Sequence, residues 1–272
     1  MLLLIKNGGV GKTTTTVNLG EGLVRNGKKV LLIDFDPQGD LTTSLGFKRK
    51  DEIETTIKTL MENIIQEKPI NKADGVLLNN AGVKLIPANI ELEALETTLM
   101  KCINKETVLK RYINQVRNDY DYILIDCRPS LGLLTINALA SADSVIIPVQ
   151  AQYLPLNGMI QLFQTIDKTR VQINPNLKIE GVLLTIADTK TKLARATEDA
   201  IKKSYGGKIK VYNTIIPMGV KAAESALEGK SIYAYDKTSK PAIAYEEFTR
   251  EVLRDGDRQK NRASECRWFI QT

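Results

Sequence analysis

A glycine-rich run near the start of the chain has the residue types that hold phosphate. It reads Gly8-Gly9-Val10-Gly11-Lys12-Thr13-Thr14. Glycines let successive backbone N–H groups point at phosphate oxygens. Lys12 could reach the β- and γ-phosphates, and the Thr13 hydroxyl could complete a Mg²⁺ shell. The general pattern is G-x-x-x-x-G-K-[ST], and this chain has Lys6 where the first glycine would stand. We therefore predict that this run binds a nucleotide phosphate, through all seven of its residues.

Acidic residues end two apolar runs of strand length. Asp34 follows residues 30–33, Asp36 comes two residues later, and Asp126 follows residues 122–125. In an open parallel sheet the carboxyl ends of the strands lie along the edge where ligands bind. Asp126 fits the acid that holds Mg²⁺ directly or through water, while Asp34 and Asp36 are candidates to position the metal shell and orient an attacking water. Acids at strand ends are also common turn formers or helix caps, but the phosphate loop beside them favours the functional interpretation.

Strands and helices must alternate to bring these residues together. The phosphate loop precedes a helical pattern at residues 13–26, and further strands are predicted at 30–33, 83–86, 121–126, 144–149, 179–185 and 211–216. Strand, helix, strand in that order implies parallel pairing and right-handed crossovers. We predict an α/β fold with a doubly wound, mostly parallel sheet flanked by helices. A single domain is expected over residues 1–254, ending in a helix at 242–253 and followed by a loosely ordered tail at 255–272.

Composition excludes several classes of function. Among the 272 residues there is no histidine, which removes His-based triads, the commonest zinc ligands and the usual general base. The three scattered cysteines supply neither a disulfide framework nor a closed zinc site, as expected in a reducing cytoplasm. No apolar run reaches the ~18 residues of a membrane span, and the first strand leaves no room for a signal peptide. We expect a cytoplasmic protein without stable membrane association.

Several blocks of the sequence together resemble the ParA/Soj-type partition ATPases, within the family that also contains MinD and the nitrogenase iron protein. The resemblance covers residues 2–254. Besides the phosphate loop, its markers are "VLLIDFDPQ", "DYILIDCRPSLGLLTINA", "ADSVIIPVQAQY" and "IIPMGVKAAESALEGKSIYAYD". The resemblance implies a P-loop ATPase with ATP and Mg²⁺ that forms a nucleotide-sandwich homodimer. It also implies non-specific binding of double-stranded DNA on the nucleoid, and hydrolysis stimulated by a ParB-like centromere-binding protein, in plasmid, chromosome or mobile-element partition.

The resemblance also assigns roles to individual positions. Lys12 binds phosphate, Thr13 ligates Mg²⁺, Asp126 supports the metal and Asp36 orients the attacking water. Lys12 and Asp36 are thus the expected catalytic residues. Pro217 is expected near the adenine.

This sequence departs from the family pattern at the position before the paired glycines. Such proteins carry a signature lysine there, which reaches the phosphates of the dimer partner, and this chain has Asn7. An amide brings no charge to the transition state. Lys6 lies one residue earlier, where its side chain points elsewhere. Arg128 replaces a usual proline, and Met218 replaces a frequent arginine whose loss could remove one DNA contact.

Basic residues concentrate between residues 188 and 210. Seven lysines and arginines lie there against three acids, most of the net charge of +6. Within a helix predicted at 191–204, four of them fall near one side, namely Lys192, Arg195, Lys202 and Lys203. Basic side chains there could contact phosphates and release counterions. An ordinary solvated helix face is the alternative, but the resemblance favours DNA contacts at these residues and at Lys221.

Three other functions remain to be weighed. A MinD-like membrane-cycling ATPase needs a C-terminal amphipathic helix, of which residues 267–270 supply only a fragment. An iron–sulfur reductase needs paired bridging cysteines, and Cys127 has no evident partner in the sequence. An ATP-binding switch with little hydrolysis is the reading that Asn7 favours.

Overall fold

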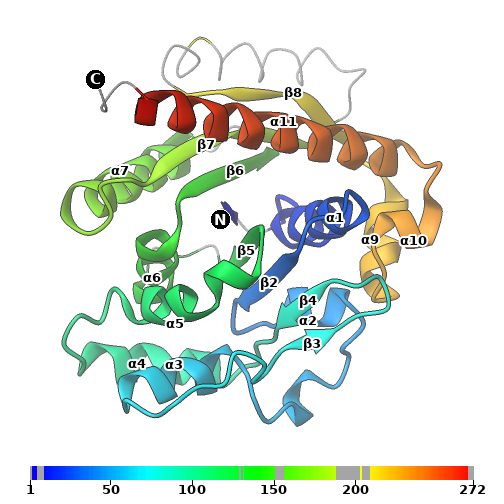
Figure 1. The fold of residues 1–272 in the computed structure, drawn as a ribbon. Coiled ribbons are helices and arrows are strands. Elements are labelled where there is room, and N and C mark those ends of the chain that lie inside the picture. Colours follow the sequence, from blue (N-terminus) through cyan, green and yellow to red (C-terminus); the bar gives the residue numbers. More distant parts are fainter. Residues whose placement is uncertain are drawn as a thin grey trace.

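An eight-stranded sheet forms the centre of the molecule, in the order β3-β4-β2-β5-β1-β6-β7-β8 (Figure 1). The computed structural model describes residues 2–4, 9–128, 130, 132–150, 156–187, 203 and 209–268. Neighbouring strands are parallel except β3 and β4, which are antiparallel. The strands are β1 (Leu2–Leu4), β2 (Val30–Phe35), β3 (Leu77–Leu78), β4 (Lys84–Ile86), β5 (Tyr122–Cys127), β6 (Ser144–Gln150), β7 (Lys178–Ala187) and β8 (Val211–Pro217). The predicted doubly wound, mostly parallel sheet is confirmed.

Helices follow most of the strands and cover both faces of the sheet (Figure 1). They are α1 (Lys12–Arg25), α2 (Asp40–Ser44), α3 (Ile57–Ile65), α4 (Leu92–Met100), α5 (Val108–Val116), α6 (Leu133–Ser141), α7 (Leu156–Gln172), α9 (Val220–Leu227), α10 (Ile232–Asp236) and α11 (Lys240–Trp268), with 3₁₀ turns η1 (Lys50–Glu52) and η2 (Arg117–Asp119). The helix predicted at residues 191–204 lies outside the described residues apart from Lys203.

Alternation along the central strands decides which side chains meet which helices. In β2, Leu31, Ile33 and Phe35 belong to the core formed with α3 to α7, and Leu32 belongs to the core formed with α1 and α11. Successive side chains of a strand point to opposite faces. Asp34 therefore shares the face of Leu32, the face covered by α1. Its neighbour in register on β5 is Asp126, which places two carboxylates beside the helix that follows the phosphate loop.

Two glycines allow α1 to approach its neighbours closely. A Cβ added to Gly20 would lie 2.8 Å from Leu32 Cδ2, and one added to Gly22 would lie 2.3 Å from Thr249 Oγ1. Gly20 faces β2, whereas Gly22 faces α11. The second contact depends on a helix more than two hundred residues away in the chain, so local sequence could not reveal it.

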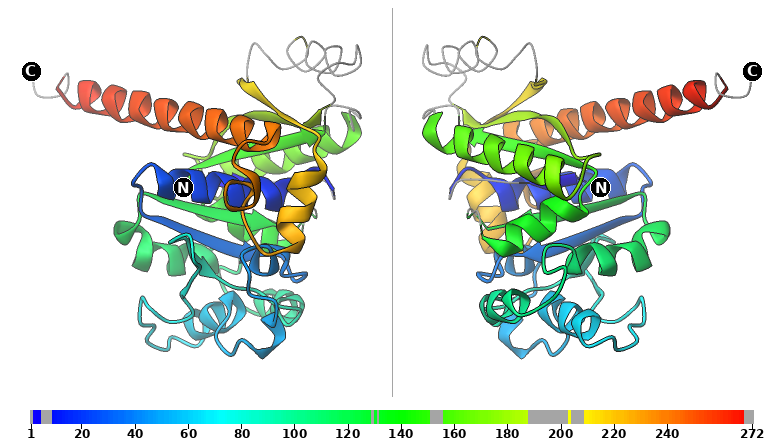
Figure 2. Two further views of the ribbon diagram at one scale, coloured as in Figure 1. Left: turned by 90° about the vertical axis from the view of Figure 1, so that its right-hand side faces the viewer. Right: turned by 90° about the vertical axis from the view of Figure 1, so that its left-hand side faces the viewer.

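The C-terminal helix differs from its prediction. It begins at Lys240 and continues to Trp268, past the expected end at residue 253 and into the segment predicted to be loosely ordered. Figure 2 shows this part of α11 extending beyond the sheet. Arginine, lysine and glutamine in this segment have high helix propensity, which favours the continuation. None of the described helices is both long and apolar enough to cross a membrane.

Candidate nucleotide-binding site

The phosphate loop is described from Gly9 onward, so Asn7 and Gly8 lie outside the described residues. Gly9 and Gly11 have φ angles of 73° and 78°, in the left-handed region that costs glycine little. Gly11 is the N-cap of α1. Backbone N–H groups of the first helical turn have no partner within the helix, and together with the helix dipole they attract an anion. The predicted phosphate cradle therefore has the required backbone shape in its described part.

Thr13 points from the start of α1 toward the acid on β5, and the charge of its neighbour Lys12 interacts with the same acid. Thr13 Oγ1 donates a hydrogen bond to Asp126 Oδ2 at 2.6 Å. Lys12 and Asp126 are both buried. Burial lowers the pKa of Lys12, while Asp126 and Asp36 oppose that shift. Burial raises the pKa of Asp126 to about 7, against the hydrogen bond from Thr13 and the charge of Lys12. A cation placed here would favour the ionised form of the carboxylate.

The residues present fit a hard divalent cation. Asp126 Oδ1 is buried and has no hydrogen-bond partner among the described residues. Thr13 donates a hydrogen bond to Asp126, so the lone pairs of its hydroxyl oxygen remain free to coordinate a cation. Mg²⁺ is usually held by one or two protein oxygens together with phosphates and water. The hydroxyl of Thr13 and the carboxylate of Asp126 are such oxygens, so they suit Mg²⁺ bound together with a phosphate ligand.

The loop between β2 and α2 supplies the polar edge of the site. Asp36, Gln38 and Asp40 all line one cavity with the phosphate loop. Asp36 Oδ1 accepts the backbone N–H of Gln38 at 3.0 Å, which fixes the side chain within a tight turn. Gly39 then turns the chain into α2 at a φ of 62°. Asp36 is thus held at the cavity, as its predicted role in orienting water requires.

Asp34 does not line this cavity. Its Oδ1 accepts the backbone N–H of Asp36, and its Oδ2 accepts both the N–H and the hydroxyl of Thr42. Burial, and then repulsion from Asp126, raise the pKa of Asp34 to about 8. Since these hydrogen bonds occupy the carboxylate, the geometry favours a role in holding the β2–α2 loop. The assignment of Asp34 to the metal shell stays a prediction, and the contacts described for its carboxylate are with the β2–α2 loop.

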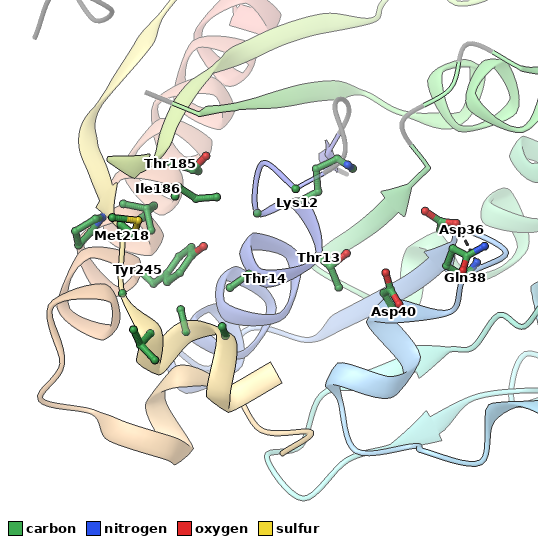
Figure 3. A pocket seen from close by; sticks show the side chains of 18 residues that line it. Lys12, Thr13, Thr14, Asp36, Gln38, Asp40, Thr185, Ile186, Met218 and Tyr245 are labelled. Carbon is green, nitrogen blue, oxygen red and sulfur yellow. Dashed lines mark hydrogen bonds between the residues drawn. The ribbon is translucent and has the colours of Figure 1, made fainter. Parts of the chain in front are cut away.

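A cavity of about 660 Å³ runs from the phosphate loop to the turn between β8 and α9. Figure 3 shows Asp36, Gln38 and Asp40 at one end, Ile186, Met218 and Tyr245 at the other, and Thr13 and Thr14 between them. Its volume falls within the range of small-molecule sites. Pro217 lines the same cavity as Met218, and its expected place near the adenine stays a prediction. The cavity therefore has a polar phosphate end and an apolar end.

Several cavity residues escaped the sequence analysis. Thr185 and Ile186 come from β7, and Tyr245 comes from α11. The Tyr245 hydroxyl lies 3.1 Å from Thr15 Oγ1 in α1. Each of these three residues belongs to an apolar strand or helix pattern that predicts a place in the hydrophobic core. Nothing in the spacing of these patterns indicates a ligand. Only the packing of α11 and β7 around α1 brings them to the site.

Comparison with known proteins decides the family. Residues 3–179 match the AAA domain family. The chain is 43% identical over 251 residues to the sporulation initiation inhibitor protein Soj of Bacillus subtilis, covering 92% of this chain and 96% of that protein. It is 38% identical over 261 residues to the chromosome partitioning protein ParA of Caulobacter vibrioides, covering 95% of each. The chain belongs to the ParA/Soj family of partition ATPases.

The fold of this ParA/Soj-type ATPase also matches that of a solved structure. Cobyrinic acid a,c-diamide synthase from Mycobacterium smegmatis, with bound ADP and magnesium, superposes with a TM-score of 0.80 at 34% identity. The match covers 94% of this chain and 95% of that one. The predicted P-loop ATPase fold and ATPase activity are thus confirmed at the level of the family.

The DNA-binding candidates of this ParA/Soj-type ATPase are only partly described. Lys192, Arg195 and Lys202 lie outside the described residues, and Lys203 is exposed. Lys221 is also exposed, at the start of α9, with Glu224 at 3.7 Å. Lys210, which contributed to the basic run, pairs with Glu251 at 3.2 Å and with Asp255. Its charge is therefore shared with two carboxylates of α11.

Proposed function

We propose that this chain is an ATP- and Mg²⁺-dependent partition ATPase that binds double-stranded DNA without sequence specificity as an ATP-bound homodimer. A ParB-like centromere-binding protein stimulates its hydrolysis and releases the DNA, so that the protein cycles on and off the nucleoid. Family membership supports the partition role. The cavity lined by the phosphate loop and Asp36, with Asp126 hydrogen-bonded to Thr13 of that loop, supports nucleotide binding and is the observation that carries the proposal.

Four side chains divide the chemistry at the phosphate end. Lys12 provides positive charge to the phosphates from a buried position. Thr13 and Asp126 would hold Mg²⁺, which would supply positive charge to the phosphates when bound. Asp36, fixed by its turn, orients the attacking water. These are the positioning and electrostatic contributions on which phosphoryl transfer depends.

DNA binding is tested with a fluorescent duplex of arbitrary sequence and the full chain in the presence of ATP, ADP or no nucleotide. Binding should need ATP and fall steeply with added salt, because the contacts are to phosphates. Lys203→Glu and Lys221→Glu should weaken binding. Lys101→Glu, an exposed lysine that follows α4 on the other face of the sheet, is the matched control. Equal binding with ADP, or binding that ignores salt, would contradict the proposal.

An ATP-binding switch with little hydrolysis is the second candidate, and Asn7 is the observation that favours it. The test compares ATP turnover of the native chain with that of Asn7→Lys, with and without DNA. If the missing charge limits hydrolysis, the lysine variant should turn over ATP faster by about tenfold or more. No gain from the lysine would remove the switch hypothesis, and ADP affinity of both chains serves as the control for folding.

A further inference from the structure

The end of β7 contacts two walls of the nucleotide cavity at once. Thr185 Oγ1 donates a hydrogen bond to the carbonyl oxygen of Val10 in the phosphate loop, at 2.7 Å. Two residues later, the carbonyl oxygen of Ala187 accepts the backbone N–H of Met218, at 3.0 Å, in the turn at the apolar end of the cavity. Thr185 and Ala187 are both almost completely buried. One strand end thus joins the phosphate loop to the turn after β8.

The bond to Val10 fixes the orientation of one peptide in the phosphate loop. In a planar trans peptide the carbonyl and the following N–H point in opposite directions. With the Val10 carbonyl held by Thr185, the N–H of Gly11 must lie on the other side of that peptide. Glycine at a φ of 78° permits several peptide orientations at little cost. The hydroxyl of Thr185 selects one of them before any ligand arrives.

Ile186 shows that β7 departs from regular strand geometry at this point. Its φ is 50°, which is rare for a β-branched residue and persists only where the surroundings enforce it. The pairing of β7 with β8 shifts register between Leu184 and Ala187. Ile186 itself lines the cavity. The hydrogen bonds of Thr185 and Ala187, on either side of Ile186, hold its backbone in this conformation.

We infer that Thr185 is a positioning residue of the phosphate loop, which fixes the Val10–Gly11 peptide and so presets its N–H groups for a nucleotide phosphate. It acts through the loop backbone and needs no contact with the ligand. The inference rests on nucleotide binding in this cavity as proposed above. It adds a residue that the phosphate-loop motif does not contain, because Thr185 follows Val10 by 175 positions.

The test measures two quantities for the full chain: affinity for ADP with Mg²⁺ by calorimetry, and the backbone amide resonance of Gly11 in the nucleotide-free protein. Thr185→Val keeps the shape and removes the donor. It should weaken ADP binding by about five- to tenfold and shift the Gly11 resonance before ADP is added. Thr185→Ser should restore both quantities, and Thr185→Cys, a weaker donor, should fall between the valine variant and the native chain.

Ser141→Ala is the matched control, because Ser141 Oγ also donates to a backbone carbonyl, that of Asn137, within α6 and away from the cavity. It should leave both quantities unchanged. If Thr185→Val lowers affinity without shifting the Gly11 resonance, Thr185 contacts the ligand directly and the inference is wrong. Unchanged affinity overturns it too. If the valine variant does not fold, the native chain and the serine and cysteine variants still test the inference. The cysteine variant should then bind ADP more weakly than the other two. Failure of the native chain to bind ADP would instead overturn the proposed function.

Discussion

Asp34 and Asp36 are two residues apart, yet their carboxylates have different surroundings. Asp36 lines the nucleotide cavity, whereas Asp34 is fully buried and bonded to Thr42. Thr42 Oγ1 also accepts the backbone N–H of Ala88, at 3.1 Å. A single hydroxyl therefore links the end of β2, the start of α2 and the chain just after β4. The position of Asp36 depends on residues that never touch the ligand.

Thr42→Val should slow ATP turnover by about tenfold, because the β2–α2 loop loses its link to Asp34 and Ala88 and Asp36 no longer holds water in place. ADP affinity should change by less than about twofold, since Lys12 and Thr13 bind phosphate from a separate loop. Steady-state hydrolysis and calorimetry measure the two effects. Thr42→Ser should behave like the native chain.

Thr43→Val is the control for that substitution. Thr43 lies beside Thr42 in α2, but its hydroxyl donates only locally, to the carbonyl of Gly39. It should retain most of the turnover. An equal loss in both variants would show that α2 is sensitive to any change, and the specific role of Thr42 would be rejected.

At the scale of elements, one buried carboxylate of α11, that of Glu251, hydrogen-bonds to the backbone of the edge strand β8. Glu251 accepts the backbone N–H groups of Asn213 and Thr214 and pairs with Lys210. Unpaired N–H groups on an edge strand invite pairing with other chains. Burial alone would raise the pKa of Glu251, but these hydrogen bonds and Lys210 outweigh it, and the pKa lies below its usual range. The ionised form of Glu251 therefore stabilises the folded state.

Glu251→Gln should lower the free energy of unfolding by about 1–3 kcal/mol at pH 7, because the bonds to the two N–H groups lose their charge assistance and the ion pair with Lys210 is lost. A lowered pKa in the folded state contributes stability above the unfolded pKa of about 4.3, and this contribution disappears as the pH falls through the folded value. The difference between native chain and variant should thus shrink below about pH 4. Urea unfolding across pH 7 to 3.5 measures it, and a difference independent of pH would refute the assignment.

At the scale of the whole molecule, the cavity draws its walls from segments across the chain. The phosphate loop, the β2–α2 loop, β7, the β8–α9 turn and α11 all contribute. A ligand that contacts all of them binds only when both cores are assembled. Nucleotide occupancy and global stability must therefore be linked.

ADP with Mg²⁺ at about one hundred times its dissociation constant should stabilise the native chain by about 2.7 kcal/mol. Thermal or urea unfolding at several ADP concentrations gives the measurement. Lys12→Ala should abolish most of the increase, because its charge faces the phosphates. Stabilisation of that variant to the same extent would place the ligand elsewhere than in this cavity.

The sequence by itself determined the features that depend only on neighbouring residues in the chain. The run from Gly9 to Thr14 forms its loop and helix start through its own φ preferences, and the apolar strands that end at Asp34 and Asp126 predict both the parallel sheet and the edge where ligands bind. The family blocks in the sequence then predicted the ATPase and the position of Pro217 at the cavity.

Tertiary structure alone decided which distant residues complete the site. Thr185 and Tyr245 read as core residues of a strand and a helix, and they reach the phosphate loop and α1 only because β7 and α11 pack there. Asp34 carries the same sequence signal as Asp36, but its carboxylate accepts hydrogen bonds from Thr42, and Asp36 lines the cavity. Periodicity reports which face a side chain occupies, whereas its partner is set by contacts between segments that lie far apart in the chain.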